Sequence, residues 1–412
     1  MSKFNFESSL RLTQISLLIS GIRISKVNYG KAFQKFIDFY LYYFNLFWLH
    51  TDALAEINWL VEAVIAGKSF VETSLCIPCI TISFLATAKS IPLYLNRNIV
   101  AGVVDKLRDI HPEISDEEEA KINEGCAVND NVKSNDQEKQ IVKESATIIK
   151  LIVLMQCYIC IVVVVAFPLM PVISMIYEYC MKGILEYKYP YLANYFFNTD
   201  RLVIWPFIYF HHIYSTAIVG INLFGSDTLF IAACVYIQMH FRLLCHRLEN
   251  VVSSNPELTK RNLMLAIKRH QELIDLVNQV ELLFSKSILF NIVTSSVLMC
   301  LSGFIIMMLE DVGVVISFAT FFLHDLSQIS LLCYFGDILM TSSTQISTAI
   351  YNSRWYNTDE NTKKTMLLML IRAQRPCKLT ASNFSDLNLS AFTTILSRSW
   401  SYFALLKTMY KP

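Results

Sequence analysis

Apolar residues in this chain gather in blocks of about 20, the length of helix that crosses a hydrocarbon core about 30 Å thick. The blocks lie at roughly 36–60, 71–95, 147–177, 202–224, 287–309, 312–334 and 390–410. Hydrophobic residues make up 54% of the chain and charged residues only 17%, whereas soluble domains average about 25% charged residues. The sequence therefore predicts an all-α membrane protein with seven transmembrane helices.

The basic residues between these blocks set the expected orientation. With the blocks taken as spans, 26 Lys and Arg residues fall on the side of the N-terminus and 6 on the other side. Cytoplasmic segments of membrane proteins carry the excess of Lys and Arg. We therefore expect a cytoplasmic N-terminus and an extracellular C-terminus, which is the reverse of a G-protein-coupled receptor.

Several segments are expected to lie in the cytoplasm. The apolar block 229–244 continues the fourth helix beyond the bilayer, because Gln238, His240 and Arg242 come where that helix would reach water. Residues 245–286 alternate apolar and charged positions at helical spacing after Asn255, which predicts an amphipathic helix. The acidic, polar stretch 109–144 is predicted to be a cytoplasmic loop.

The sequence contains no signature of an enzyme or a metal site. Cys76 and Cys79 form a Cys-x-x-Cys pair in an apolar run without a second pair. His211 and His212 are adjacent, so they point about 100° apart on a helix and do not make a metal-binding pair. The net charge is +1, and no basic tract suggests a nucleic-acid partner. We expect no catalysis, no metal and no cofactor.

Polar groups inside the spans are the candidate functional residues, because each is costly at the bilayer centre. His211 and Tyr214 in the fourth span, and His324, Asp325 and Gln328 in the sixth, stand out. Two interpretations remain open: hydrogen bonds between helices, or a largely apolar ligand cavity with a few polar groups. The candidate ligand-binding residues, chosen by depth and side-chain type, are Ser83, Phe167, Met170, Phe210, His211, Tyr214, Phe318, Phe321, Phe322 and Asp325.

Near the C-terminus, short motifs occur in a fixed order. Residues 334–337 read Tyr-Phe-Gly-Asp, residues 372–376 read Arg-Ala-Gln-Arg-Pro, and residues 401–406 read Ser-Tyr-Phe-Ala-Leu-Leu. This order resembles the C-terminal signature of insect odorant receptors. The resemblance covers the last quarter of the chain in several pieces, whereas the earlier residues match only in the number and spacing of spans.

The resemblance implies a subunit of a tetrameric, ligand-gated, non-selective cation channel in the plasma membrane of a sensory neuron. A variable tuning subunit there assembles with a common coreceptor and detects a small, volatile, largely apolar and uncharged molecule. Leu405 and Met409 would form the apolar gate of the pore, and Thr408 a polar pore position, whereas Lys407 would point away from the axis. The coreceptor has an extended cytoplasmic loop where this chain passes directly into the helix after Asn255, which favours a tuning subunit.

The expected organisation follows from the spans and the resemblance together. It comprises a cytoplasmic N-terminus at 1–35, spans one to four with an outer ligand-pocket region at 36–244, the amphipathic helix of a cytoplasmic anchor at 245–286, spans five and six at 287–345, a cytoplasmic anchor segment at 346–388 and a pore-lining last helix at 389–412. Two alternatives are a gustatory receptor-type channel and a small-solute transporter. A transporter would predict internal repeats and matched helix breaks, and Pro168 and Pro171 have no matched pair elsewhere.

Overall fold

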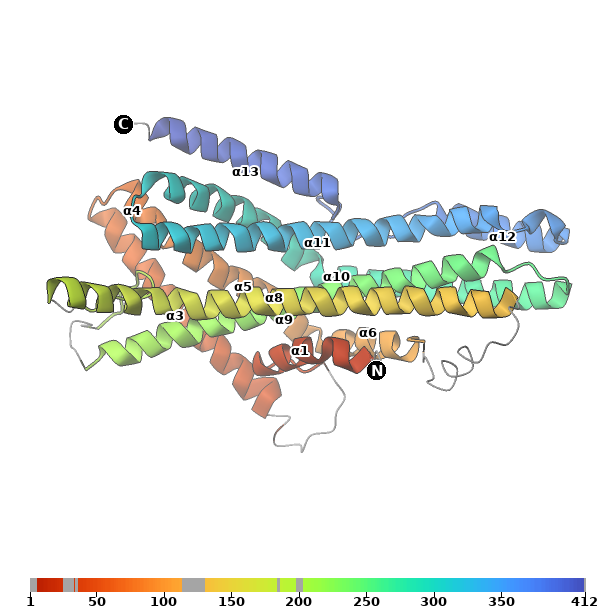
Figure 1. The fold of residues 1–412 in the computed structure, drawn as a ribbon, viewed down its shortest axis with the longest axis horizontal. Helices are drawn as coiled ribbons and strands as arrows, with labels where there is room; N and C mark the ends of the chain where they lie inside the picture. Colours follow the sequence, from red (N-terminus) through yellow and green to blue (C-terminus); the bar gives the residue numbers. More distant parts are fainter. Residues whose placement is uncertain are drawn as a thin grey trace.

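The computed structural model describes residues 6–24, 33, 36–112, 130–183, 186–197 and 203–410. Its elements in chain order are α1 Phe6–Ile19, a π-helix Phe36–Leu41, α3 Tyr42–Ile65, α4 Phe70–Ser74, α5 Ile77–Leu95, α6 Arg97–Asp109, α8 Asp130–Lys182, α9 Trp205–Glu249, α10 Pro256–Met308, α11 Val312–Asn352, a 3-10 turn Trp355–Asn357, α12 Glu360–Ala373 and α13 Leu389–Met409. The long helices α8 to α11 run along the molecule, and α13 lies at its edge (Figure 1).

Side-chain caps set several of the helix ends. Asn255 accepts a hydrogen bond from the Glu257 backbone N–H at 3.0 Å, at the start of α10 where the sequence predicted it. Asp311 accepts from the backbone N–H groups of Gly313 and Val314 and so caps α11, with only three residues between the end of α10 and the start of α11. These caps satisfy backbone donors that have no partner within the helix.

The helix α9 is the centre of the fold and is continuous from Trp205 to Glu249. Residues 229–244 are buried almost throughout, and α9 packs against α1, α3, α5, α8, α10 and α11. Residues 229–244 thus continue the fourth helix as predicted, and their place beyond the bilayer stays a prediction. Because α9, α10 and α11 all run on as unbroken helices (Figure 1), the predicted boundaries at residues 244, 286 and 345 fall inside helices.

The predicted cytoplasmic loop at 109–144 is wrong for its second half. Residues 130–144 are the first turns of α8, while residues 113–129 lie outside the described part of the chain. Charge pairing between helices explains why so polar a segment is helical. Arg247 on α9 donates two hydrogen bonds to Glu138, at 2.9 and 2.8 Å, and Arg242 lies 3.1 Å from Glu144. Arg247 lowers the pKa of Glu138, which therefore stays ionised.

The sequence did not predict the helix α1. It packs on α9 through the buried side chains of Phe6, Leu10 and Leu17 and also through hydroxyl groups. Thr13 donates to Thr228 at 3.0 Å, and Ser16 donates to the Ile221 carbonyl at 2.8 Å. Helices approach closely where such small polar side chains meet.

Five helices in the described part of the chain are long and apolar enough to cross a membrane by composition alone: α4–α5 taken together, α8, α9, α10 and α11. The other two predicted spans, α3 and α13, contain more polar, charged and aromatic residues. Asp52, Glu56 and Glu62 lie on α3, and Arg398 and Lys407 lie on α13. The cavity described next includes side chains of α3, and the predicted gate residues lie on α13.

Candidate functional site

A cavity lies between α3, α5, α8, α9 and α11. The empty space inside it, open solvent at its mouth included, is about 790 Å³. Most of its wall is apolar. The apolar lining residues are Ile82, Val163, Val164, Phe167, Val219, Leu223, Phe224 and Phe321.

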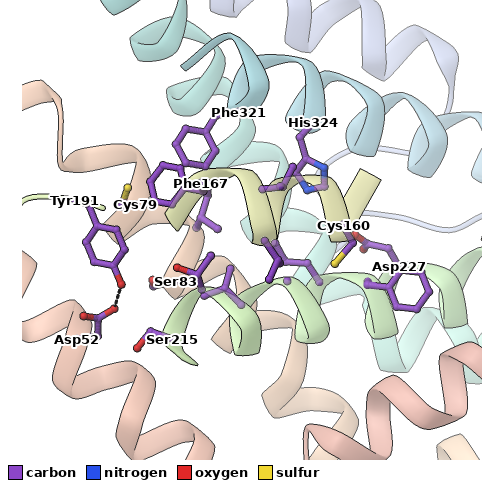
Figure 2. A pocket seen from close by; sticks show the side chains of 18 of the residues that line it. Asp52, Cys79, Ser83, Cys160, Phe167, Tyr191, Ser215, Asp227, Phe321 and His324 are labelled. Atoms are coloured by element: carbon purple, nitrogen blue, oxygen red, sulfur yellow. Dashed lines mark hydrogen bonds between the residues drawn. The ribbon is translucent and has the colours of Figure 1, made fainter. Parts of the chain in front are cut away.

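Aromatic and acidic residues form the outer end of this cavity, where Tyr191 comes from the connection between α8 and α9. Its hydroxyl donates to Asp52 on α3, and the two side chains face one another in Figure 2. The Tyr191 ring stacks on His212, with ring centres 4.2 Å apart. Burial, and then the Asp52 charge, raise the pKa of Tyr191 far above its ordinary value. Tyr191 therefore remains a neutral hydrogen-bond donor that holds the connection over the cavity.

Charged and amide groups form the inner end. Lys89 of α5 donates to Asp227 of α9 at 2.5 Å, and Gln328 of α11 donates to the same carboxylate. His324 of α11 and Asp227 both line the cavity and lie away from Tyr191 in Figure 2. A buried pair of this kind costs several kcal/mol if one partner is removed. It therefore holds α5, α9 and α11 in one register at the bottom of the cavity.

Three of the ten predicted ligand-binding residues line this cavity, namely Ser83, Phe167 and Phe321. Phe167 and Phe321 contact each other with ring centres 5.1 Å apart. Phe167 also stacks on Tyr191 at 5.9 Å. The three aromatic rings thus form one wall near the cavity's outer end.

Three other predicted residues make hydrogen bonds to neighbouring helices or to the outer connection. His211 is joined to Thr51 at 3.1 Å and to Tyr195 at 2.9 Å. Tyr214 donates to Asn45 at 2.8 Å, and Asp325 accepts from Ser295 at 2.8 Å. For these side chains the structure shows the first of the two interpretations that the sequence left open, hydrogen bonding within the protein.

The remaining four predicted residues lie outside the cavity lining. Phe210 is 57% exposed, on the outer surface of α9. Met170 and Phe322 are half-buried, and Phe322 packs against the main core. Phe318 is buried in a separate hydrophobic cluster beside the cavity. The role of all ten residues in ligand binding stays a prediction.

That separate cluster connects the cavity to α13. Phe318 and Phe304 form its buried centre, and Phe321 of the cavity wall packs on one side. Phe403 and Leu406 of α13 belong to the same cluster. A side chain of the cavity wall and two side chains of the last helix therefore share one packed group.

The last turns of α13 carry an exposed face. Leu405 is 59% exposed and Met409 69% exposed. On a helix Leu405 lies about 160° from the packed Phe403 and about 100° from Leu406, and Met409 lies about 120° and about 60° from the same two residues. Thr408 and Lys407 are exposed as well. The predicted gate residues are thus free to meet other subunits or a pore in an assembly.

The segment that leads into α13 is fixed by hydrogen bonds to α10 and α11. Glu281 accepts from the Thr380 backbone N–H at 2.8 Å, and Ser285 donates to the Thr380 carbonyl at 3.0 Å. The Cys377 backbone N–H donates to Ser343 at 2.9 Å. Asn388 then caps α13 by accepting from the Ala391 N–H at 2.8 Å.

Sequence reasoning missed the acidic residues of the cavity. Asp52 and Glu56 are 2% and 1% exposed. The signal was present, because two carboxylates one helical turn apart in an apolar block are costly unless they face a cavity or a partner. Within the described residues, no cluster of three or more His, Cys, Asp or Glu side chains is placed to hold a metal ion.

Comparison with known proteins identifies a matching family and similar proteins. Residues 69–399 match the family model described as 7tm Odorant receptor. The chain is similar to Putative odorant receptor 92a of Drosophila melanogaster, 26% identical over 363 residues that cover 87% of this chain and 84% of that protein. It is also similar to Odorant receptor 67c of the same fly, 24% identical over 339 residues that cover 81% of this chain and 79% of that protein.

The fold also matches a solved structure, that of the insect olfactory receptor OR5 from Machilis hrabei in complex with eugenol. The TM-score is 0.81 at 14% identity, and the match covers 98% of this chain and 97% of that chain. At this identity the likeness shows the fold, an all-helical arrangement of seven transmembrane helices that includes α3 and α13.

Proposed function

The chain belongs to the insect odorant receptor family of ligand-gated olfactory channels, and we propose that within such a channel it is the odour-binding subunit, assembled with the family coreceptor in a tetramer. The expected family and the expected seven-transmembrane fold are confirmed. The family consists of receptor channels, so the chain is not an enzyme, and the gustatory and transporter alternatives are set aside. It is a multi-pass membrane protein, which we assign to the plasma membrane of a sensory neuron.

The cavity between α3, α5, α8, α9 and α11 supports the ligand-binding part of this proposal. It is mostly apolar and formed within one chain, so this subunit can bind a small volatile molecule by itself. The similarly folded receptor from Machilis hrabei was solved in complex with eugenol. The short connection at 250–255 between α9 and α10 supports a tuning subunit, because the coreceptor is expected to carry an extended loop there.

The route from ligand to gate passes through the cluster around Phe318. A ligand that contacts Phe321 alters the packing of a group that also contains Phe403 and Leu406 of α13. Packed groups switch between discrete arrangements rather than deform continuously. A ligand with higher affinity for the arrangement in which α13 is displaced therefore shifts the channel towards the open state.

The exposed face of α13 supports its role in the pore. Leu405 and Met409 lie one turn apart, so four copies of this face, or of its counterpart in the coreceptor, form an apolar ring. Such a ring blocks hydrated ions by dewetting and conducts once it widens.

Recording currents tests this function directly. Cells that express the chain together with the family coreceptor should carry cation currents in response to a panel of volatile compounds, and cells that express either subunit alone should not show the same responses. Responses that are identical with and without this chain would remove the odour-binding role.

A further inference from the structure

One acidic side chain in the cavity wall has an oxygen without a partner. Glu56 is 1% exposed, and its Oε2 has no hydrogen-bond partner among the described residues. Its neighbour Asp52 already accepts hydrogen bonds from Tyr191 and, at 3.3 Å, from Tyr195. Glu56 is therefore the carboxylate that remains for a ligand.

A second unpartnered group, on a different helix, faces the same cavity. Ser215 of α9 is 2% exposed, and its Oγ has no hydrogen-bond partner in the part of the chain that the structure describes. It lines the cavity and lies at the same end as Asp52 in Figure 2. Buried polar groups in native proteins are nearly always paired. Two such groups that face one cavity point to a polar group of the ligand.

The chemistry of these atoms limits what that polar group can be. A carboxylate only accepts hydrogen bonds, so its partner has to donate. Asp52 and Glu56 are one turn apart on α3, where a second negative charge is costly in a low-dielectric interior, and a positive charge beside them favours the ionised form of both. The rings of Tyr191, Phe167 and Phe321 line the same region, and aromatic faces attract cations further.

We propose that the odour bound by this receptor is a small organic amine, whose protonated head lies between Glu56 and Ser215 and whose apolar body lies along α8 and α9. The ammonium donates to Glu56 Oε2 and to the Ser215 hydroxyl oxygen, and the aromatic wall packs over it. The body contacts Val164, Val219 and Leu223. This inference rests on the proposed odour-binding function, and it replaces the expectation of an uncharged ligand. An amine still reaches the receptor as a volatile, because its neutral form is in equilibrium with the ammonium in water.

The test compares two compounds with the same body. Cells that express the receptor with the coreceptor receive phenethylamine or phenethyl alcohol, and the half-maximal concentration is measured for each. We expect the amine to act at a concentration about tenfold or more lower, the factor that a charge-assisted hydrogen bond contributes.

Variants assign the preference to one residue. Glu56→Gln keeps the size of the side chain and removes its charge, so the half-maximal concentration of the amine should rise about tenfold or more while that of the alcohol changes little. Glu56→Asp should retain the preference. Glu186→Gln, an exposed carboxylate in the outer connection, is the matched control and should leave both concentrations unchanged. Surface labelling checks delivery, and Ser215→Ala replaces Glu56→Gln if the latter is retained inside the cell.

The outcomes distinguish a failure of the amine proposal from a failure of the proposed odour-binding function. Responses to the alcohol without a preference for the amine, or a preference that survives Glu56→Gln, would overturn the amine assignment and leave the odour-binding role standing. A receptor that reaches the surface with its coreceptor and responds to neither compound class would overturn the odour-binding role itself.

Discussion

Replacing Gly336 by alanine should loosen the attachment of α13. A Cβ at this position would lie 2.5 Å from the Leu387 carbonyl oxygen and 2.9 Å from the Leu387 side chain. Leu387 is buried, and its N–H donates to the Leu379 carbonyl at 2.8 Å, so it cannot move aside without breaking that contact. The residue that follows it, Asn388, caps α13.

The expected size follows from two opposing effects. Overpacking a well-filled site costs about 1–3 kcal/mol, and a clash with backbone lies at the upper end. Alanine in a helix is favoured over glycine by about 1 kcal/mol, which leaves a net destabilisation of about 2 kcal/mol. Gly102→Ala is the matched control, because a Cβ there meets nothing within 4 Å, and it should be neutral or stabilising.

Thermal unfolding of the detergent-solubilised protein, followed by fluorescence-detected size exclusion, measures the difference. Gly336→Ala should unfold at a lower temperature than the wild type and carry smaller odour currents at equal surface expression. If Gly336→Ala and Gly102→Ala unfold at the same temperature, the close approach of α11 to the segment before α13 is not the reason for glycine in the Tyr-Phe-Gly-Asp motif.

Three further predictions concern the cavity, its connection to the gate and the anchor. Gly220→Ala should place a Cβ 2.6 Å from Val164 Cγ2 in the cavity wall. Half-maximal odour concentrations should then rise in dose–response recordings, most for bulky compounds. Unchanged concentrations would mean that ligands bind elsewhere. Phe318→Leu should shift the balance between closed and open states by about 0.5–2 kcal/mol and so lower the maximal current. An unchanged maximal current would mean that this cluster takes no part in gating. Burial, and then Arg372, lower the pKa of His270 in the cytoplasmic part of α10 to about 4. Between about pH 6.5 and 4, His270 therefore binds a proton more readily in the unfolded chain than in the folded protein. The melting temperature should fall as pH is lowered through this window, and it should fall less in His270→Leu.

The sequence predicted the spans because lipid demands continuous apolar helices, and that demand is local to each block. It did not predict α1 or the helical start of α8, because both are held by contacts with a distant part of α9. Arg247 pairs with Glu138, and Thr13 pairs with Thr228. Such pairs are invisible until the helices are placed side by side.

The sequence named few of the residues that line the cavity. Phe167 and Phe321 line the cavity as expected, because large aromatic residues at the right depth face the interior on two neighbouring helices. His211 and Tyr214 were chosen for their polarity, yet their partners Thr51, Tyr195 and Asn45 come from α3 and the outer connection. Polarity alone cannot say whether a partner is protein or ligand.

The central claim is that the last helix of this chain lines a cation pore that an odour opens, and cysteine accessibility tests it most directly. The test uses three variants, Leu405→Cys, Met409→Cys and Lys407→Cys. Each is expressed with the coreceptor in a background in which the exposed Cys180 is replaced by serine. A water-soluble thiol reagent applied with the odour should block current at positions 405 and 409 and have little effect at 407. Block at 407 alone would contradict the assignment of this face of α13 to the pore.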